Sequence, residues 1–335
     1  MKALFADPVI NKTQNLGAVN SINWARILAQ ITYYFQAYFL LLRSPSFQVG
    51  SKIRFVVPTG NFGDVLAGYY AKRMGLPIEK LLVATNENDI LDRFWKSGYY
   101  EKKPVHGREA DGGLAEDGAK AHEDGAKETL SPAMDILVSS NFERLLWFLA
   151  YEYDGSAGER SWQVAGSKVK SWLEDLKRDG GFGVEPEVLE LAKRDFESER
   201  VSDSQTVDTI KQFYRGSSEA ETGVGQGQTS GDTKASYILD PHSAVGIAAA
   251  LRSIAKHPPP VHHITLATAH PAKFAHAVDL ALKDENGFDF DNVLPEQFIG
   301  LEKMEKRVRV MEKGAKWEDI RTVISEELAK EEGLT

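Results

Sequence analysis

Residues 58–67, PTGNFGDVLA, constrain the fold of this chain more than any other stretch. They follow residues 53–57 (IRFVV), a run of β-branched and aromatic side chains that predicts a buried strand. Pro58 has no N–H to give to a sheet, so we expect the strand to end there. A helix is predicted from Asp64. Basic residues followed by glycine and proline predict where this helix ends. A strand, a glycine-containing loop and a helix therefore follow one another directly.

The loop between this strand and this helix, TGNFGD at residues 59–64, suits an anion. Gly60 and Gly63 let the backbone turn sharply and approach a ligand, and the first N–H groups of a helix point at it with the positive end of the dipole. No Lys-Ser/Thr pair follows, and the pattern is not GxGxxG. Spacing alone leaves an ordinary tight turn as an equal alternative. The carboxylate of Asp64 would repel a phosphate, so we expect it to cap the helix or bind another polar group.

Strands and helices alternate after this unit, as is typical of a parallel sheet. The further expected strands are residues 80–85, 237–239 and 263–267. The expected helices are residues 16–42, 89–96, 161–177, 186–198 and 202–214, one after a capping box at Ser140 to Glu143, and one from Asp240-Pro241. We predict an α/β fold with an open, mostly parallel sheet and helices on both faces.

Two soft stretches interrupt this pattern. Residues 105–128 contain the repeat EDGAK and few apolar side chains, and residues 216–234 (GSSEAETGVGQGQTSGDTK) are rich in glycine and small polar residues. We expect both to be disordered insertions in an α/β core of residues 1–290. Residues 291–335 alternate Lys, Arg and Glu at helical spacing, which predicts a solvated helical tail.

Charge and composition exclude several classes of protein. The net charge of −9 and the absence of a basic patch argue against nucleic acid as a partner. No cysteine is present, which removes disulfides and thiolate chemistry and fits a reducing compartment, so we expect a cytoplasmic protein. Residues 28–42 are densely apolar but shorter than a membrane span and contain glutamine, which favours a buried core helix over a membrane helix.

Five separated blocks carry a family resemblance. They read NLGAVNSINWARILAQITYYF, PTGNFGDVLAGYYAKRMGLPIEKLLVATNENDILDRFW, LSPAMDILVSSNFERLLW, ILDPHSAVG and LATAHPAKF, in that order. Together they resemble the threonine synthases, pyridoxal 5'-phosphate (PLP) enzymes of the tryptophan-synthase β type, and the fungal form most. The resemblance implies PLP fold type II, PLP as cofactor, and a carbon–oxygen lyase that converts O-phospho-L-homoserine and water to L-threonine and phosphate in threonine biosynthesis.

The same resemblance implies roles for individual residues. The cofactor phosphate would be held by the backbone amides of Gly60, Asn61, Phe62 and Gly63, with Asp64 also at the cofactor site. Thr268 would hydrogen-bond the pyridine nitrogen, which leaves that nitrogen largely unprotonated.

A second group of residues, in the NSINWAR block, suits the substrate phosphate: Asn20, Ser21, Asn23 and Arg26. The alternative is that Arg26 is a surface charge and Asn20 or Ser21 only caps a helix. His242 and His270 adjoin prolines and fit turns or packing better than a cofactor role. No metal is expected, because His262 and His263 lack a third ligand at metal spacing.

One departure from the family limits these expectations. Threonine synthases use a lysine that forms a Schiff base with PLP, in a phenylalanine-lysine-aspartate motif upstream of NSINWAR, and this sequence has no such motif. We therefore expect a chain truncated at its N-terminus, with no catalytic lysine and little activity alone. A non-catalytic fragment that binds PLP or phosphate, or another β-type enzyme such as threonine dehydratase, remains an alternative, and the oligomeric state is open.

Overall fold

The computed structural model describes residues 4, 7–13, 20–103, 105–106, 120–121, 125–155, 158–216, 237–257, 259–306 and 308–331. The chain divides into two compact units, Met1–Asn20 with Glu296–Thr335, and Ser21–Pro295, which are described separately. The predicted division near residue 290 stays a prediction. Residues 107–119, 122–124 and 217–236, which make up most of the two predicted insertions, lie outside the described residues.

A four-stranded parallel sheet organises the larger unit, and the predicted α/β class is confirmed. Its order is β7-β2-β1-β8. The strands are β1 (Lys52–Pro58), β2 (Lys80–Thr85), β7 (Phe196–Arg200) and β8 (Val261–Thr265). Two antiparallel pairs accompany the sheet: β3 (Tyr99–Glu101) with β6 (Gly181–Gly183), and β4 (Lys120–Ala121) with β5 (Lys127–Glu128).

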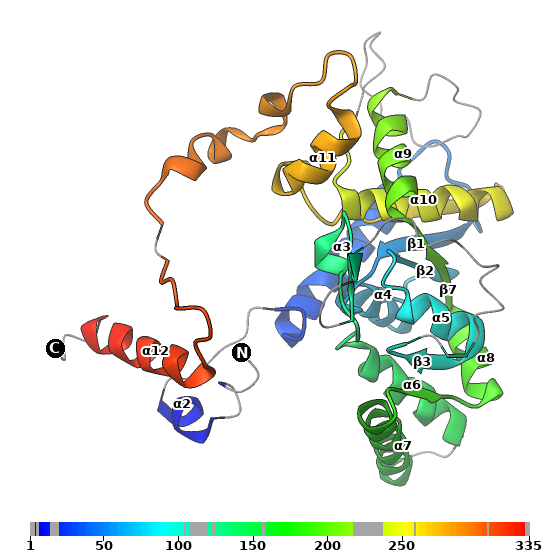
Figure 1. Cartoon of the computed structure of the whole chain (residues 1–335). Helices are drawn as coiled ribbons and strands as arrows, with labels where there is room; N and C mark the ends of the chain where they lie inside the picture. The colour runs from blue at the N-terminus through cyan, green and yellow to red at the C-terminus, as the bar shows by residue number, and fades with distance from the viewer. Residues whose placement is uncertain are drawn as a thin grey trace. The chain divides into compact units, whose positions relative to one another are not determined.

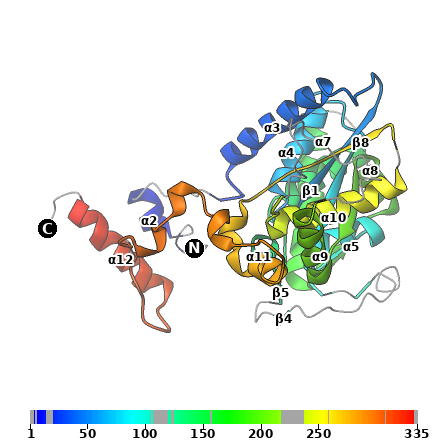
Figure 2. The same ribbon diagram turned by 90° about the horizontal axis from the view of Figure 1, so that it is seen from above.

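Helices cover both faces of this sheet. The α-helices of the larger unit are α3 (Trp24–Leu42), α4 (Gly63–Arg73), α5 (Ile90–Ser97), α6 (Phe142–Asp154), α7 (Glu159–Arg178), α8 (Pro186–Asp195), α9 (Asp203–Tyr214), α10 (Pro241–Lys256) and α11 (Ala275–Leu282). In Figure 1, α10 lies along one side of the strands, and α4 and α5 lie on the other side. The view from the α10 side shows α9, α10 and α11 together over the sheet (Figure 2).

Alternation along β1 explains the two layers. Phe55 and Val57 point into a core shared with α3, α4 and α6, whereas Val56 packs with Val245 and Ala249 of α10. All of these side chains are fully buried, as expected of a central parallel strand covered on both faces. The strand is therefore fixed in place from both sides, and so is the point at which it ends.

The helix α3 differs from its prediction in two ways. It begins at Trp24, after a side-chain cap from Asn23 Oδ1 to the N–H of Ala25 (2.9 Å), and residues 20–23 form a bend and turn. It is also not enclosed on every side, because Leu28, Phe39 and Leu40 are about half exposed. No helix in the described ranges has both the length and the apolar character needed to cross a membrane.

Three further predictions were wrong. The helix predicted for residues 186–198 stops at Asp195, and residues 196–200 form strand β7. The expected capping box at residues 140–143 is absent: α6 starts at Phe142, and Asn141, which precedes it, makes no side-chain cap. The polar side chains at this helix start are used elsewhere, as described below. Residues 237–239 are not a strand either.

The smaller unit contains the helices α2 (Pro8–Thr13) and α12 (Trp317–Glu331). Asp7 caps α2 through the N–H groups of Val9 and Ile10, and its other carboxylate oxygen pairs with Arg321 of α12 at 2.9 Å. Among the described residues of both units, the short 3-10 turns are η2 (Pro132–Met134), η3 (Pro271–Phe274), η4 (Phe290–Val293), η5 (Glu296–Phe298) and η6 (Leu301–Lys303).

Candidate functional site

The strand order creates a crevice at the carboxyl ends of β1 and β8. From β1 the chain proceeds through β2 to β7 on one side, while β8 pairs with β1 on the other side. The helix that follows β1 lies on one face and the helix that precedes β8 lies on the opposite face, so the connections diverge at this position. Open α/β sheets bind their ligands at such switch points. The topology therefore predicts a ligand site at the loops after Pro58 and after Thr265.

A cavity of about 820 Å³ lies at these loops. It is lined by residues 58–65 after β1, by residues 264–269 after β8, and by parts of α3 and of the segments around Ala133 and Lys273. The predicted site residues among its lining are Ser21, Arg26, Gly60, Asn61, Phe62, Gly63, Asp64 and Thr268. The two blocks that carry the cofactor predictions thus meet at one cavity, although about 200 residues separate them in the sequence.

Strain in the loop falls on Phe62 and not on the glycines. Phe62 has a φ of +62°, a left-handed conformation that costs an ordinary residue about 1–2 kcal/mol. Its buried ring compensates by packing on Trp95 and Phe142, with centroids 5.9 and 5.3 Å away. Gly60 is required for a different reason: a Cβ there would lie 3.0 Å from the carbonyl oxygen of Ala133.

The loop presents unpaired backbone donors to the cavity. The N–H groups of Asn61, Phe62 and Gly63 donate to no other residue within the part of the chain that the structure describes. They lie at the N-terminus of α4, whose first N–H groups have no intrahelical acceptor and carry the positive end of the helix dipole. This combination of free amides and a helix start binds phosphate, sulfate or carboxylate groups.

Asp64 lies beside these donors and is held by two tyrosines of α3. The hydroxyl of Tyr33 donates to Asp64 Oδ1 at 3.0 Å, and that of Tyr34 donates to the Asp64 carbonyl at 2.8 Å. Burial raises the pKa of Asp64 to about 6, although the two tyrosine hydroxyls oppose this shift. Burial, and then the charge of Asp64, also raise the pKa of both tyrosines. A carboxyl group that is readily protonated repels a neighbouring phosphate less than an ordinary aspartate does.

Thr268 is exposed on the opposite wall and is fixed through its backbone. Its N–H donates to Ser243 Oγ at 3.2 Å, and Ser243 in turn donates to the N-cap residue Asp240. The Thr268 hydroxyl has no hydrogen-bond partner among the described residues, so it is available to a ligand. Its role toward a pyridine nitrogen stays a prediction.

His242 lies on the cavity wall. The sequence favoured a role in turns or packing for this residue, because it adjoins a proline. Its Nδ1 contacts Asp240 Oδ1 at 3.0 Å, and its Nε2 accepts the N–H of Ala133 at 3.1 Å. Because Nε2 accepts, the ring is neutral with its proton on Nδ1. This arrangement excludes a serine–histidine–aspartate triad with Ser243, and it holds the backbone that packs against Gly60.

The four residues predicted for a substrate phosphate separate. Ser21 and Arg26 line the cavity, and the charge of Arg26 acts on the Tyr33 hydroxyl. Asn23 caps α3, a role that the alternative gave to Asn20 or Ser21. Asn20 is exposed at the end of the smaller unit, and its role stays a prediction.

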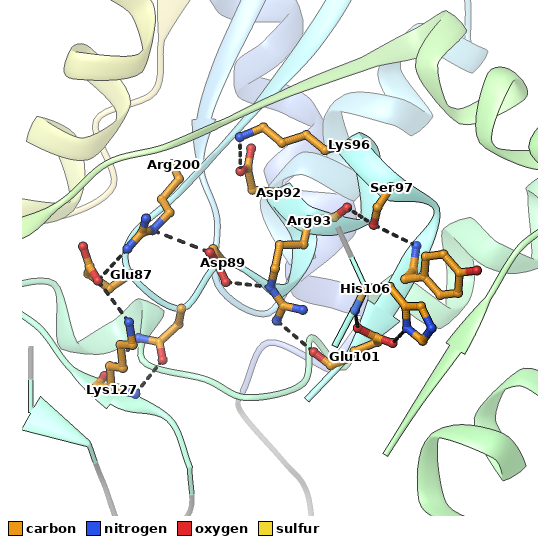
Figure 3. Close-up of polar contacts among 12 residues, drawn as sticks. Glu87, Asp89, Asp92, Arg93, Lys96, Ser97, Glu101, His106, Lys127 and Arg200 are labelled. Carbon is orange, nitrogen blue, oxygen red and sulfur yellow. Dashed lines mark hydrogen bonds and ion pairs between the residues drawn. The ribbon is translucent and has the colours of Figure 1, made fainter. Parts of the chain in front are cut away.

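The neighbouring carboxyl ends of β2 and β7 hold charges that pair among themselves (Figure 3). Arg200 Nη2 donates to Glu87 at 2.7 Å, and Lys127 approaches the same carboxylate oxygen at 3.2 Å. Arg93 bonds Asp89 at 2.9 Å and the carbonyl of Glu101 at 2.8 Å. Arg200 and Lys127 neutralise the buried carboxylate of Glu87, and Arg93 pairs with the half-buried Asp89, so the crevice at β1 and β8 is the better anion site.

Sequence reasoning missed the residues that hold the loop from behind. Ser139, Ser140 and Asn141 all donate to it, and their spacing before an apolar run indicated only a helix start. The block SSNFE carried no local signal for this role, because the partners of these residues lie about 80 residues earlier in the sequence.

Comparisons with known proteins show which proteins this chain resembles. Residues 243–324 match the family model "Threonine synthase, C-terminal". The threonine synthase of Saccharomyces cerevisiae is 47% identical over 98% of this chain, and that of Eremothecium gossypii is 46% identical, also over 98%. Over the region that it spans, the chain is similar to the threonine synthases.

Solved threonine synthases share the fold as well. The crystal structure of the yeast threonine synthase superposes with a TM-score of 0.79 over 98% of this chain. The PLP-bound threonine synthase from Brucella melitensis is 36% identical, with a TM-score of 0.66 over 92% of this chain. The PLP fold type II predicted from the resemblance is thereby confirmed. The chain spans 57% of the yeast threonine synthase and 56% of the Eremothecium threonine synthase.

Proposed function

We propose that the cavity binds PLP, with its phosphate on the loop at residues 60–63. The observation that carries this proposal is that free loop amides, the start of α4 and Thr268 line one cavity at the switch point of the sheet. The residues fit the cofactor: the amides of Asn61, Phe62 and Gly63 would hold the phosphate, and the Thr268 hydroxyl would face the pyridine nitrogen. PLP, when bound, supplies an electron sink for loss of a substrate α-proton.

We further propose O-phospho-L-homoserine as substrate of the whole protein, with L-threonine and phosphate as products. Arg26 is the cationic side chain of α3 on the cavity wall, and with Ser21 it would bind the substrate phosphate. Asp64 would remain partly protonated beside the cofactor phosphate, which limits repulsion. Lys273 also lines the cavity, but the resemblance gives the covalent role to a lysine motif that this sequence does not contain.

Calorimetry on the full chain tests the cofactor proposal. PLP should bind more tightly than pyridoxal, which has no phosphate, and inorganic phosphate should compete with PLP. Gly60→Ala should weaken PLP, because the new Cβ would lie 3.0 Å from the Ala133 carbonyl and displace the loop. Gly166→Ala is the matched control, since a Cβ there meets nothing within 4 Å and lies on α7. Equal affinity for PLP and pyridoxal would contradict the proposal.

The reaction needs a separate test, because it concerns the whole protein. We expect the chain alone to form little threonine from O-phospho-L-homoserine. Joined to the part of the yeast enzyme that it does not match, it should form threonine and release phosphate, and Arg26→Ala should raise the KM for the substrate. Turnover of threonine itself, without use of the phosphorylated substrate, would support a dehydratase instead.

A further inference from the structure

Three consecutive side chains between α5 and α6 donate hydrogen bonds to the loop at residues 60–63. Ser139 Oγ donates to the carbonyl oxygen of Gly60 at 2.6 Å. Ser140 Oγ donates to Asn61 Oδ1 at 3.1 Å, and Asn141 Nδ2 donates to the Asn61 carbonyl oxygen at 2.9 Å. The loop is therefore held by a segment about 80 residues away in the sequence.

Asn141 also holds the residues that lead into α3. Its Nδ2 donates to the carbonyl oxygen of Ser21 at 2.7 Å, and its Oδ1 accepts a hydrogen bond from Arg144. The same arginine donates to the carbonyl oxygen of Ile22 at 3.1 Å. Asn141 is only 1% exposed, so these bonds are shielded from water. A single buried amide thus joins two segments of the cavity wall.

The side-chain amide of Asn141 uses all of its N–H donors on these two segments. Both N–H bonds of an asparagine amide are used here, each on a main-chain carbonyl that belongs to no helix or strand. Asn141 does not cap α6 and does not line the cavity. Its neighbour Ser139 donates its N–H to the buried Tyr100 hydroxyl at 2.8 Å, which ties the segment to the aromatic core.

We infer that Asn141 is a positioning residue that sets the loop at residues 60–63 and the Ser21 segment in one arrangement that binds phosphate. The inference deepens the proposed function and rests on it. Asn141 touches no ligand in this account and acts through the backbone that it holds.

Asn141→Ala and Asn141→Asp in the full chain test this role. Both should weaken binding of PLP and of inorganic phosphate by the same factor, at least about 10-fold for the loss of two buried hydrogen bonds. Pyridoxal affinity should stay unchanged, because pyridoxal has no phosphate to place on the loop. Asn141→Asp should lose at least as much as the alanine variant, since it keeps the shape but turns an acceptor toward two carbonyl oxygens.

Two controls separate positioning from general loss of stability. Ser202→Ala removes the capping box of α9, whose residues do not line the cavity, and should leave all three affinities unchanged. In the free chain, hydrogen–deuterium exchange should become faster both at residues 60–63 and at residues 21–23 in the Asn141 variants. Arg144→Ala, which removes the partner of Asn141 Oδ1 and the donor to the Ile22 carbonyl oxygen but keeps the Asn141 amide, should give the same pattern in milder form.

The outcomes are distinct. If the unaltered chain does not prefer PLP to pyridoxal, the proposed function fails and this inference fails with it. If the unaltered chain does prefer PLP but Asn141→Ala binds it equally tightly, only the inference is wrong. A parallel fall in pyridoxal affinity would also overturn it, because that result indicates general distortion of the cavity.

Discussion

The hydroxyl of Tyr34 donates a hydrogen bond of 2.8 Å to the backbone carbonyl of Asp64, where α3 crosses the start of α4. The Tyr34 ring reaches this point because residue 68 is glycine: a Cβ there would lie 2.6 Å from the ring. The position of the first turn of α4, and with it the anion site, is therefore set by packing between two helices.

Removing this hydroxyl should loosen the helix start. Tyr34→Phe should lower the free energy of unfolding by about 1 kcal/mol, the usual net value of a buried hydrogen bond, as measured by urea denaturation. Tyr70→Phe is the control, since the Tyr70 hydroxyl makes no hydrogen bond within the described residues. An equal effect of both substitutions would show that the hydrogen bond contributes nothing specific.

Backbone strain at residue 62 makes an unusual prediction about glycine. Phe62→Ala should lower stability by about 3–5 kcal/mol, because a buried ring is lost while the left-handed conformation remains. Phe62→Gly should be the more stable of the two variants by about 1 kcal/mol, since glycine adopts a positive φ without cost. At an ordinary position alanine is the more stable, so the opposite order would refute the strain.

Asp64 should make stability depend on pH in an uncommon direction. Its folded pKa, about 6, lies above the ordinary value of 3.8, so the native state keeps a proton that the unfolded chain releases. This contribution is present below pH 3.8 and is lost as the pH rises through 6. Relative to Asp64→Asn, the unaltered chain should lose up to about 3 kcal/mol between pH 4 and pH 7 in phosphate-free buffer. If the free energies of unfolding of the unaltered chain and of Asp64→Asn change in parallel with pH, Asp64 does not cause this pH dependence.

His263 should act in the opposite sense. Burial, with the nearby charge of Arg54, lowers its pKa to about 4, and its Nε2 is 2.9 Å from Ser253 Oγ. Its contribution is present above pH 6.5 and is lost as the pH falls through 4, because the unfolded chain then binds a proton that the native state does not. Between pH 7 and pH 4, the free energy of unfolding of His263→Gln should fall by about 1–2 kcal/mol less than that of the unaltered chain. Solvent screening limits the size of this difference. Thermal unfolding at several pH values measures this difference.

Local patterns in the sequence were sufficient for the central unit of the fold. β1, the loop and α4 follow one another as predicted, and β2 has the predicted bounds, because buried apolar runs and clear stops determine them. The strand β7 was not predicted, since FESER is mostly charged and forms an edge strand whose polar side chains make ion pairs.

The candidate site was predictable only where its residues follow one another. The glycine loop could be read locally, and the family resemblance was needed for Thr268. Asn141 could not be found this way, because its partners Ser21 and Asn61 are 120 and 80 residues distant. Its amide serves the loop, while local spacing indicated a helix cap.

We expect the amides at residues 61–63 to bind a phosphate group. Titration of ¹⁵N-labelled chain with PLP and with inorganic phosphate, followed by amide chemical shifts, tests it most directly. The N–H signals of Asn61, Phe62 and Gly63 should move most with both ligands, and the signal of Thr268 should move with PLP alone. If the signals of other residues move while those of these three amides do not, the phosphate group does not bind at this loop.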